Sequence, residues 1–287
     1  MKILVLGATG MAGHLIVLYF KEQGYEVTAF SRRPVPFCHG IIGDVRDLSF
    51  LRSVLISGEY DIVINCIGIL NKNAEENPAD AVLCNSYLPH FIAQVTARMQ
   101  TRLIQMSTDC VFAGNTGPYD ETSFPDGRSW YDRTKALGEV DDAKNLTFRN
   151  SIIGPDMNPG GIGLFNWFMR QRDAVNGFTK AIWTGVTTYT LAQAMEQGIR
   201  EELTGIYNLV NNDTISKYDL LQLFNRYFRD DQLIIHPADT LVLDKTLKNT
   251  RTDFSFVVPS YAQMVEQMRE WIHTHEDLYK HYEFIGV

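Results

Sequence analysis

The sequence has few of the features that mark extracellular, zinc-binding or membrane proteins. Its four cysteines, at positions 38, 66, 84 and 110, form no C-x-x-C pair, which argues against a disulfide framework and a zinc finger. The apolar stretch after Met1 ends at Gly7, and the longest later one, 61–70, contains an Asn and a Gly. Both are shorter than the roughly 18–20 residues of a membrane helix, and the first is too short for a secretory signal. We therefore expect a cytoplasmic protein without a membrane partner.

Basic residues and metal-ligand patterns are also scarce. Lys and Arg number 26 against 34 Asp and Glu, so the net charge is −8 and the pI is about 5.4. A surface of this sign repels phosphate backbones, and we expect no nucleic-acid partner. The seven histidines form no H-E-x-x-H or similar spacing, so we expect no metal site. What is present, 287 residues of which 45% are apolar, suffices for one large domain or two smaller ones.

Short β-branched runs alternate with helical patterns through the first half of the chain. This alternation predicts an α/β fold, a Rossmann-like doubly wound parallel sheet with crossover helices. The expected helix between the first two strands covers 11–23, and Gly24 follows it in the position that a C-cap favours. The expected strands are 3–6, 27–30, 62–66, 103–107 and 146–149.

The pattern changes after Gly154, where turn residues fill 155–161. We expect an NADP-binding Rossmann domain over 1–154 and a smaller, mainly substrate-binding domain over 155–287. Because 191–201 looks helical and 206–210 looks like a strand, parts of about 185–212 are expected to return to the first domain, which makes the second one discontinuous. Near the end, Ser260 and Gln263 form a capping-box pattern before an apolar-periodic helix.

A G-x-x-G-x-x-G motif lies between the first expected strand and helix. Glycines let backbone amides approach a pyrophosphate, and the positive end of a helix dipole favours its charge. We therefore expect a dinucleotide at this turn, bound by Gly7, Thr9, Gly10, Met11, Ala12 and Gly13.

The end of the second strand favours NADP over NAD. An NAD enzyme places a carboxylate there for the ribose 2′-hydroxyl, whereas this chain has Ser31, Arg32 and Arg33. Guanidinium groups pair with phosphate through fixed, forked donors, so we expect these residues at the 2′-phosphate. The alternative is two solvated arginines on an exposed loop. Asp44 and Val45 are expected at the adenine, although Asp44 is also typical of a turn.

Tyr131 and Lys135 are four residues apart on an expected helix and so share one face. A neighbouring ammonium and a nicotinamide cation would favour the phenolate and lower a tyrosine pKa from about 10. Such a pair can pass a proton to a carbonyl oxygen as hydride reaches the carbon. Thr108 follows an apolar strand at the carboxyl edge of the sheet, where such sheets bind ligands. We expect Thr108, Tyr131 and Lys135 to be catalytic.

These motifs resemble those of the extended short-chain dehydrogenase/reductases, and within them the dTDP-4-dehydrorhamnose reductase family. Residues 107–114, STDCVFAG, are similar to that group's S-T-D-Y-V-F-x-G, and 131–139, YDRTKALGE, to its Y-G-x-[ST]-K-x-x-G-E. With the amino-terminal glycines and the segment 65–68, NCIG, the resemblance covers about 1–155. It places Cys66, Ile67 and Gly68 at the cofactor.

The resemblance implies an NADPH-dependent oxidoreductase that reduces a nucleotide-linked 4-keto-6-deoxysugar in deoxysugar and surface polysaccharide biosynthesis. It implies that Tyr131 is the acid, that Lys135 orients it, and that Thr108 donates a hydrogen bond to the carbonyl. The implied partner is the nucleotide-sugar substrate. The oligomeric state stays open, with a homodimer as one option.

Cys110 departs from the family pattern. Reductases usually have Tyr there, related dehydratases a catalytic Glu, and GDP-fucose synthase an epimerising Cys. A neutral thiol replaces a carboxylate poorly, and no histidine lies between His90 and His236 to act as its partner. We expect Cys110 to line the substrate pocket together with Thr108 and Tyr131.

Two further groups of residues are candidates for contact with the substrate. Trp167 is a candidate for stacking on the nucleotide base, and a packed core is the slightly favoured interpretation of its cluster with Phe165 and Phe168. Four basic residues are candidate pyrophosphate clamps, with solvated surface as the alternative for each: Arg170, Arg172, Lys180 and Arg251.

Two alternative functions stay open. The first is a non-catalytic NADP-binding regulatory subunit, because the resemblance extends to the regulatory β subunit of methionine adenosyltransferase. The presence of Thr108, Tyr131 and Lys135 weighs against it. The second is a nucleotide-sugar epimerase that keeps NAD bound, which the two arginines after the second strand disfavour.

Overall fold

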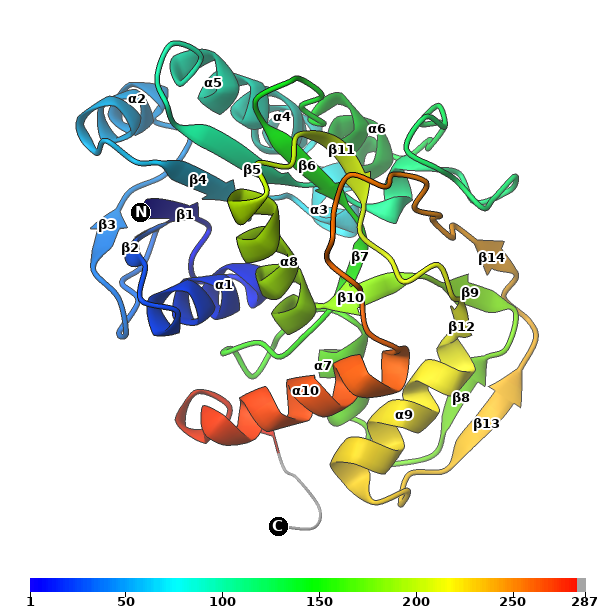
Figure 1. The fold of residues 1–287 in the computed structure, drawn as a ribbon. Helices are drawn as coiled ribbons and strands as arrows, with labels where there is room; N and C mark the ends of the chain where they lie inside the picture. The colour runs from blue at the N-terminus through cyan, green and yellow to red at the C-terminus, as the bar shows by residue number, and fades with distance from the viewer. Residues whose placement is uncertain (283–287) are drawn as a thin grey trace.

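The computed structural model describes residues 1–282 and centres on a seven-stranded parallel sheet (Figure 1). The strands follow the order β11-β6-β5-β4-β1-β2-β3, and every neighbouring pair is parallel. This confirms the expected doubly wound fold class. The strands are β1 (Lys2–Leu6), β2 (Glu26–Ser31), β3 (Gly40–Ile42), β4 (Ile62–Asn65), β5 (Arg102–Met106), β6 (Leu146–Arg149) and β11 (Gly205–Asn208).

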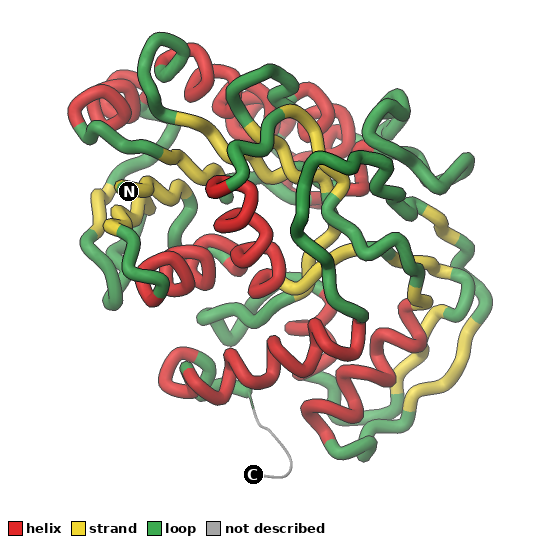
Figure 2. The backbone as a smooth tube through the Cα atoms, in the orientation of Figure 1, coloured by secondary structure: helices red, strands yellow, loops and turns green. Residues whose placement is uncertain are grey.

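Alternate residues of each strand face two separate cores. Ile3 and Val5 belong to the core under α1 (Met11–Glu22) and α8 (Thr188–Arg200), whereas Leu4 and Leu6 belong to the opposite core. This is the period of two that a pleated strand imposes. Figure 2 shows helices on both sides of the sheet. Those of the second side are α2 (Leu48–Ser57), α3 (Asn71–Glu76), α4 (Pro78–Ala81), the π-helix η1 (Val82–Tyr87), α5 (Leu88–Val95) and α6 (Trp130–Leu137).

The remaining elements form a smaller region beside the sheet. Its helices are α7 (Leu164–Met169), α9 (Lys217–Arg229) and α10 (Tyr261–Thr274). Its strands form three small sheets, which pair β7 (Ser151–Ile153) with β10 (Gly185–Thr187), β8 (Val175–Phe178) with β13 (Ile235–Ala238), and β9 (Ala181–Trp183) with both β12 (Ile215–Ser216) and β14 (Leu243–Asp244). Short 3₁₀ turns lie at η2 (Asp109–Val111) and η3 (Glu276–Leu278).

Element bounds follow local capping chemistry. The helix expected at 191–201 begins earlier, because the side chain of Thr187 accepts a hydrogen bond from the amide of Thr190 and caps α8. The expected capping box at Ser260 and Gln263 opens α10. The strand expected at 206–210 is β11, which joins the edge of the large sheet beside β6. The division into two domains stays a prediction.

The chain after α10 returns to the amino-terminal glycine turn. The ring of His14 in α1 is buried, and it donates through Nδ1 to the carbonyl of Gly10 at 3.0 Å. Its Nε2 is 2.8 Å from the hydroxyl of Tyr279, which also accepts from Nε1 of Trp271. Nearby, the hydroxyl of Tyr282 donates to Asn166 and accepts from the amide of Asp156 at 2.8 Å. In the part of the chain that the structure describes, no helix has the length and apolar character of a membrane span.

Candidate active site

The glycine motif forms the turn from β1 into α1. Gly7 has a φ angle of +80°, a left-handed backbone conformation that residues other than glycine rarely adopt. A Cβ atom on Gly13 would lie 2.2 Å from the carbonyl oxygen of Gly7, so the helix meets the turn without room for a side chain. The amide of Gly10 donates to the same carbonyl at 3.0 Å. The amino end of α1 is therefore held against the carboxyl end of β1.

A pocket of about 220 Å³ opens at this turn. It combines a helix amino terminus with guanidinium and carboxylate side chains, a combination that fits the pyrophosphate and adenosine of a dinucleotide. Among the residues expected at the cofactor, Met11, Ala12, Gly13 and Arg33 are not part of the pocket lining, and Arg33 is exposed. Those that line it are Gly7, Thr9, Gly10, Ser31, Arg32, Asp44, Val45, Cys66, Ile67 and Gly68.

Arg46 also lines this pocket, and the sequence analysis missed it. Its guanidinium lies 3.0 Å from the Asp44 carboxylate and 2.6 Å from that of Asp80. Hydrogen bonding from the backbone of Arg46 holds the pKa of Asp44 below its ordinary value, and the charges of Arg46 and Arg32 act in the same direction. The available signal was its position directly after the Asp44-Val45 pair.

Asn85 braces the strip of chain that forms one wall of the pocket. Its side chain accepts from the amide of Ile69 at 2.7 Å and donates to the carbonyl of the same residue at 2.9 Å. It also donates to the hydroxyl of Thr134 in α6 at 3.0 Å. Asn85 lies in η1, and π-helical turns are frequent at functional sites. No sequence pattern indicated this residue.

The structure brings Thr108, Tyr131 and Lys135 together beside the pocket wall. All three are buried, and Thr108 lies close enough to the phenol of Tyr131 to act on its pKa. The Thr108 hydroxyl donates to the carboxylate of Asp109 at 3.1 Å. The ammonium of Lys135 donates to the carbonyl of Met106, at the end of β5, at 2.6 Å. A capping box between Ser129 and Asp132 starts α6 and so fixes the helix that carries the tyrosine and the lysine.

Burial sets the protonation of the two helix residues. It raises the pKa of Tyr131 well above the ordinary value of 10.0, and the hydrogen bond from Thr108 only partly opposes it. Burial therefore outweighs the lowering that the sequence analysis expected from a neighbouring ammonium. Burial also lowers the pKa of Lys135 to about 8, although the charge of Glu139 acts in the opposite direction. A neutral phenol thus stands beside an easily titrated lysine.

Cys110 packs against Tyr131. Burial and the charge of Asp109 raise the pKa of its thiol to about 12. This neutral thiol agrees with a lining side chain better than with an acid or base. The part of the chain that the structure describes contains no group of three or more His, Cys, Asp or Glu side chains arranged to hold a metal ion.

The aromatic cluster after the glycine-rich loop is divided. Phe165 and Phe168 are fully buried, whereas Trp167 is 37% exposed. The candidate pyrophosphate clamps interact with other groups of the protein. Arg170 donates to the carbonyl of Gly161, Lys180 pairs with Asp239, and Arg251 pairs with Asp253.

Comparison with known proteins gives the family. The family model described as RmlD substrate binding domain matches residues 1–283. A dTDP-4-dehydrorhamnose reductase of Streptomyces griseus is 33% identical over 138 residues, which are 47% of this chain and 43% of that protein. The methionine adenosyltransferase 2 subunit beta of Xenopus laevis is 30% identical over 142 residues, 48% of this chain and 41% of that protein. This chain thus aligns with about half of the length of these relatives.

Solved structures show the same fold over most of the chain. A dTDP-4-dehydrorhamnose reductase of Bacillus anthracis, crystallised in complex with NADP, has a TM-score of 0.78 at 19% identity. The superposition covers 93% of this chain and 98% of that one. Since the family model extends over nearly every residue, the chain belongs to the RmlD substrate binding domain family.

Proposed function

We propose that this protein is an NADPH-dependent reductase of a nucleotide-linked 4-keto-6-deoxysugar, acting in deoxysugar and surface polysaccharide biosynthesis. The observation that carries the proposal is the meeting of buried Thr108, Tyr131 and Lys135 beside a pocket that fits a dinucleotide. Relatives named dTDP-4-dehydrorhamnose reductase support the substrate class.

The protonation states suit a reduction. NADPH, when bound, supplies the hydride that reaches the carbonyl carbon. Tyr131 keeps its proton at neutral pH because burial raises its pKa, so its hydroxyl can give that proton to the carbonyl oxygen. Thr108 holds the same oxygen through its hydroxyl. Lys135 then faces the phenolate that forms, and its positive charge stabilises it.

The proposal assigns the two regions of the chain different tasks. Residues 1–154 bind NADPH, and 155–287 mainly bind the sugar nucleotide. The position of α8 and β11 against the large sheet supports a return of parts of about 185–212 to the first domain. The exposure of Trp167 supports its use as a stacking surface for the nucleotide base.

A screen with purified protein tests the proposal. NADPH oxidation is followed with dTDP-, UDP-, GDP- and CDP-linked 4-keto-6-deoxysugars, and we expect turnover of at least one. Tyr131→Phe removes only the acid hydroxyl, so turnover should fall by about 10² to 10⁴ while NADPH affinity stays largely unchanged. Tight NADPH binding without oxidation of any sugar would favour the regulatory subunit that a relative represents. Full activity of Tyr131→Phe would remove Tyr131 from the mechanism.

The proposal includes a cytoplasmic homodimer. All four cysteines are free, which is usual in reducing compartments. Four large apolar side chains on η1 and α6 are exposed, and these two elements lie against each other, so they offer one apolar face to a second copy: Val82, Tyr87, Trp130 and Leu137. Light scattering of the wild type and of Leu137→Glu tests this. A dimeric mass that becomes monomeric in the variant is expected, and a monomeric wild type would refute it.

A further inference from the structure

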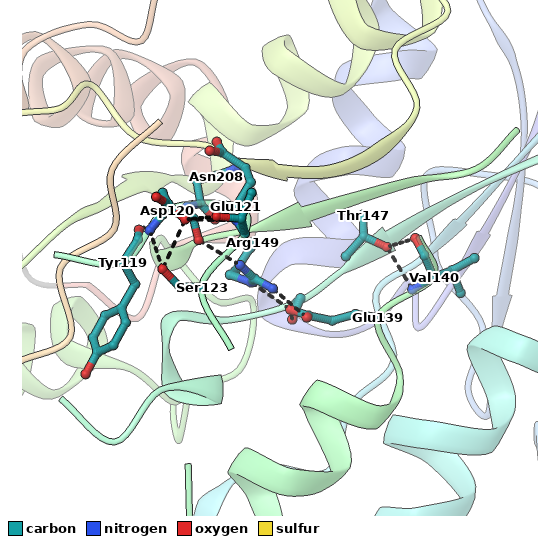
Figure 3. Close-up of polar contacts among 11 residues, drawn as sticks. Tyr119, Asp120, Glu121, Ser123, Glu139, Val140, Thr147, Arg149 and Asn208 are labelled. Carbon is teal, nitrogen blue, oxygen red and sulfur yellow. Dashed lines mark hydrogen bonds and ion pairs between the residues drawn. The ribbon is translucent and has the colours of Figure 1, made fainter. Parts of the chain in front are cut away.

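Glu139 and Arg149 form a buried ion pair (Figure 3). Arg149 ends β6, and its guanidinium binds the carboxylate of Glu139 through two hydrogen bonds of 2.8 and 2.7 Å. The two side chains are 1% and 5% exposed. Removing two charges from water costs several kcal/mol per ion, so such a pair is weak evidence for stability alone. Its surroundings indicate a second role.

The other bonds of the pair reach the chain on both sides of Thr108. The Oε1 atom of Glu139 also accepts from the hydroxyl of Ser107, the residue before Thr108, at 2.6 Å. Arg149 donates to the carbonyl of Asp120 at 3.4 Å, and its guanidinium lies 5.0 Å from the ring of Phe112. Figure 3 shows Arg149 between Glu139 on one side and Asp120 on the other. The pair therefore fixes the turn that carries Thr108.

The charge of Glu139 also acts on Lys135, which precedes it by four residues in sequence. The groups that act on this ammonium are the carboxylate of Glu139, the thiol of Cys66 at the end of β4 and the carbonyl of Met106. Tyr131 lies one turn earlier on α6. Of these groups, the carboxylate of Glu139, which pairs with Arg149, is the one that carries a charge opposite in sign to the ammonium. It opposes the burial that drives Lys135 towards its neutral form.

We propose that Glu139 and Arg149 are positioning residues for the reduction: Glu139, fixed by Arg149, orients the Ser107–Thr108 turn and supplies the negative charge opposite the Lys135 ammonium. This inference rests on the proposed function. It differs from a purely structural role, in which the pair only ties β5 to β6. Two variants separate these roles.

Glu139→Gln keeps the size of the side chain and an oxygen for Ser107 but removes the charge. It also leaves Arg149 buried without its carboxylate, which destabilises the fold. The double variant Glu139→Gln/Arg149→Met removes both charges and relieves that cost. If the single variant fails to fold, the double variant carries the test. Glu196→Gln is the matched control, because Glu196 is a buried carboxylate that accepts from Tyr19 and Tyr25 between α1 and α8.

The first measurement uses the protein without cofactor or substrate. NMR of the Lys135 side chain in isotopically labelled protein, followed across pH, reports where its amine becomes neutral. We expect this pH to fall by about one unit in both Glu139 variants and to stay unchanged in Glu196→Gln. An unchanged titration in the Glu139 variants would overturn the proposal. This result does not depend on any turnover, so it stays separate from a failure of the proposed function.

The second measurement uses the reductase activity. The alkaline limb of kcat against pH should move in the same direction as the titration, and kcat near pH 8 should fall about tenfold, with KM for NADPH little changed. A double variant that regains wild-type stability but not wild-type kcat supports positioning. A double variant that regains both would show that the pair is structural and would overturn the inference.

Discussion

Lys135 combines deep burial with a charge that the site needs. Its pKa is about 8 in the folded protein against an ordinary value of 10.5, so folding disfavours the ammonium relative to the unfolded chain. The unfolded chain binds the extra proton between these two values, and stability therefore rises with pH across that window. Below it, the full cost of burying the ammonium is present. The site thus contains a residue that weakens the fold at neutral pH.

Lys135→Met should remove that cost. Without cofactor, we expect the variant to be more stable than the wild type at pH 7 by about 1–3 kcal/mol, and to have lost reductase activity. The difference should shrink as pH rises from about 8 to 10.5, because the folded wild type loses the lysine proton in this window while the unfolded chain keeps it. Urea unfolding at several pH values measures this difference. A difference independent of pH would contradict the depressed pKa.

The cofactor pocket allows a test of individual arginines. Arg32 and Arg46 line the pocket, whereas Arg33 is exposed outside it. If Arg32 pairs with the 2′-phosphate, Arg32→Ala should weaken NADPH binding about 10- to 100-fold and NADH binding much less, since hydrogen bonds to charged groups contribute about 1.5–3 kcal/mol. Arg33→Ala is the comparator. Fluorescence titration with both cofactors measures the two affinities. Equal losses of affinity for NADPH and NADH in Arg32→Ala would refute the assignment.

Cys110 separates reduction from epimerisation. A C3 or C5 epimerase must remove and return a proton beside the ketone, so it incorporates deuterium from heavy water at that carbon. With a neutral thiol at this position, we expect no label beyond the exchange of the free keto sugar, and Cys110→Ser should keep most of the activity. Mass spectrometry of the product measures the label. Enzyme-dependent deuterium that disappears in Cys110→Ser would make this thiol catalytic.

At the scale of elements, α6 and η1 meet at one glycine. A Cβ atom on Gly138 would lie 1.8 Å from the backbone carbonyl oxygen of Asn85, which cannot move without moving η1. Asn85 also braces the pocket wall through its hydrogen bonds to Ile69. Packing between the two elements and the shape of the cofactor pocket therefore depend on the same contact.

Gly138→Ala should force η1 away from α6. We expect a loss of stability of about 1–3 kcal/mol and weaker NADPH binding, because Asn85 and the wall at Ile69 shift together. Gly160→Ala is the matched control, since its Cβ would meet no atom within 4 Å. Urea unfolding and cofactor titration measure both effects. If Gly138→Ala is as stable as Gly160→Ala, the contact between residue 138 and Asn85 relaxes without cost, which would contradict this prediction.

The elements that sequence patterns predict well are those with local signals. Hydrophobic runs and turn glycines indicate β1, α1 and the turn between them, and motif spacing indicates Thr108 with the Tyr131 helix. Such patterns do not indicate Asn85, Arg46 or the Glu139–Arg149 pair. The partners of Asn85 are 16 and 49 residues away, and only the folded sheet brings them together. η1 is a π-helix, and π-helices have no common sequence signature.

At the scale of the whole molecule, the segment after α10 joins the two ends of the chain. Figure 1 shows α10 running beneath α1 and α8. Tyr279 supplies the partner of the His14 ring, and Tyr282 holds Asn166 and the amide of Asp156. Burial keeps the pKa of His14 below its ordinary value, so the ring is neutral and accepts from the tyrosine. The segment after α10 thus holds both the glycine turn and the loop before α7.

Tyr279→Phe should loosen that support. It removes the hydroxyl that partners both His14 and Trp271, and a buried polar group left unpaired costs about 1–3 kcal/mol. We expect a lower melting temperature and NADPH binding weakened severalfold, because His14 holds the carbonyl of Gly10. Tyr227→Phe, at a partly exposed position on α9, is the control. Unchanged cofactor affinity with reduced stability would confine the role of Tyr279 to folding.

The contact between His14 and Tyr279 also has a consequence for synthesis on the ribosome. The two residues are 265 positions apart, so the glycine turn emerges long before the residue that supports it. A nascent chain can assemble its first strands early, yet its nucleotide turn stays without its final support until α10 and the segment behind it have left the exit tunnel. We therefore expect a chain to hold the cofactor firmly only after it has been translated at least as far as Tyr282.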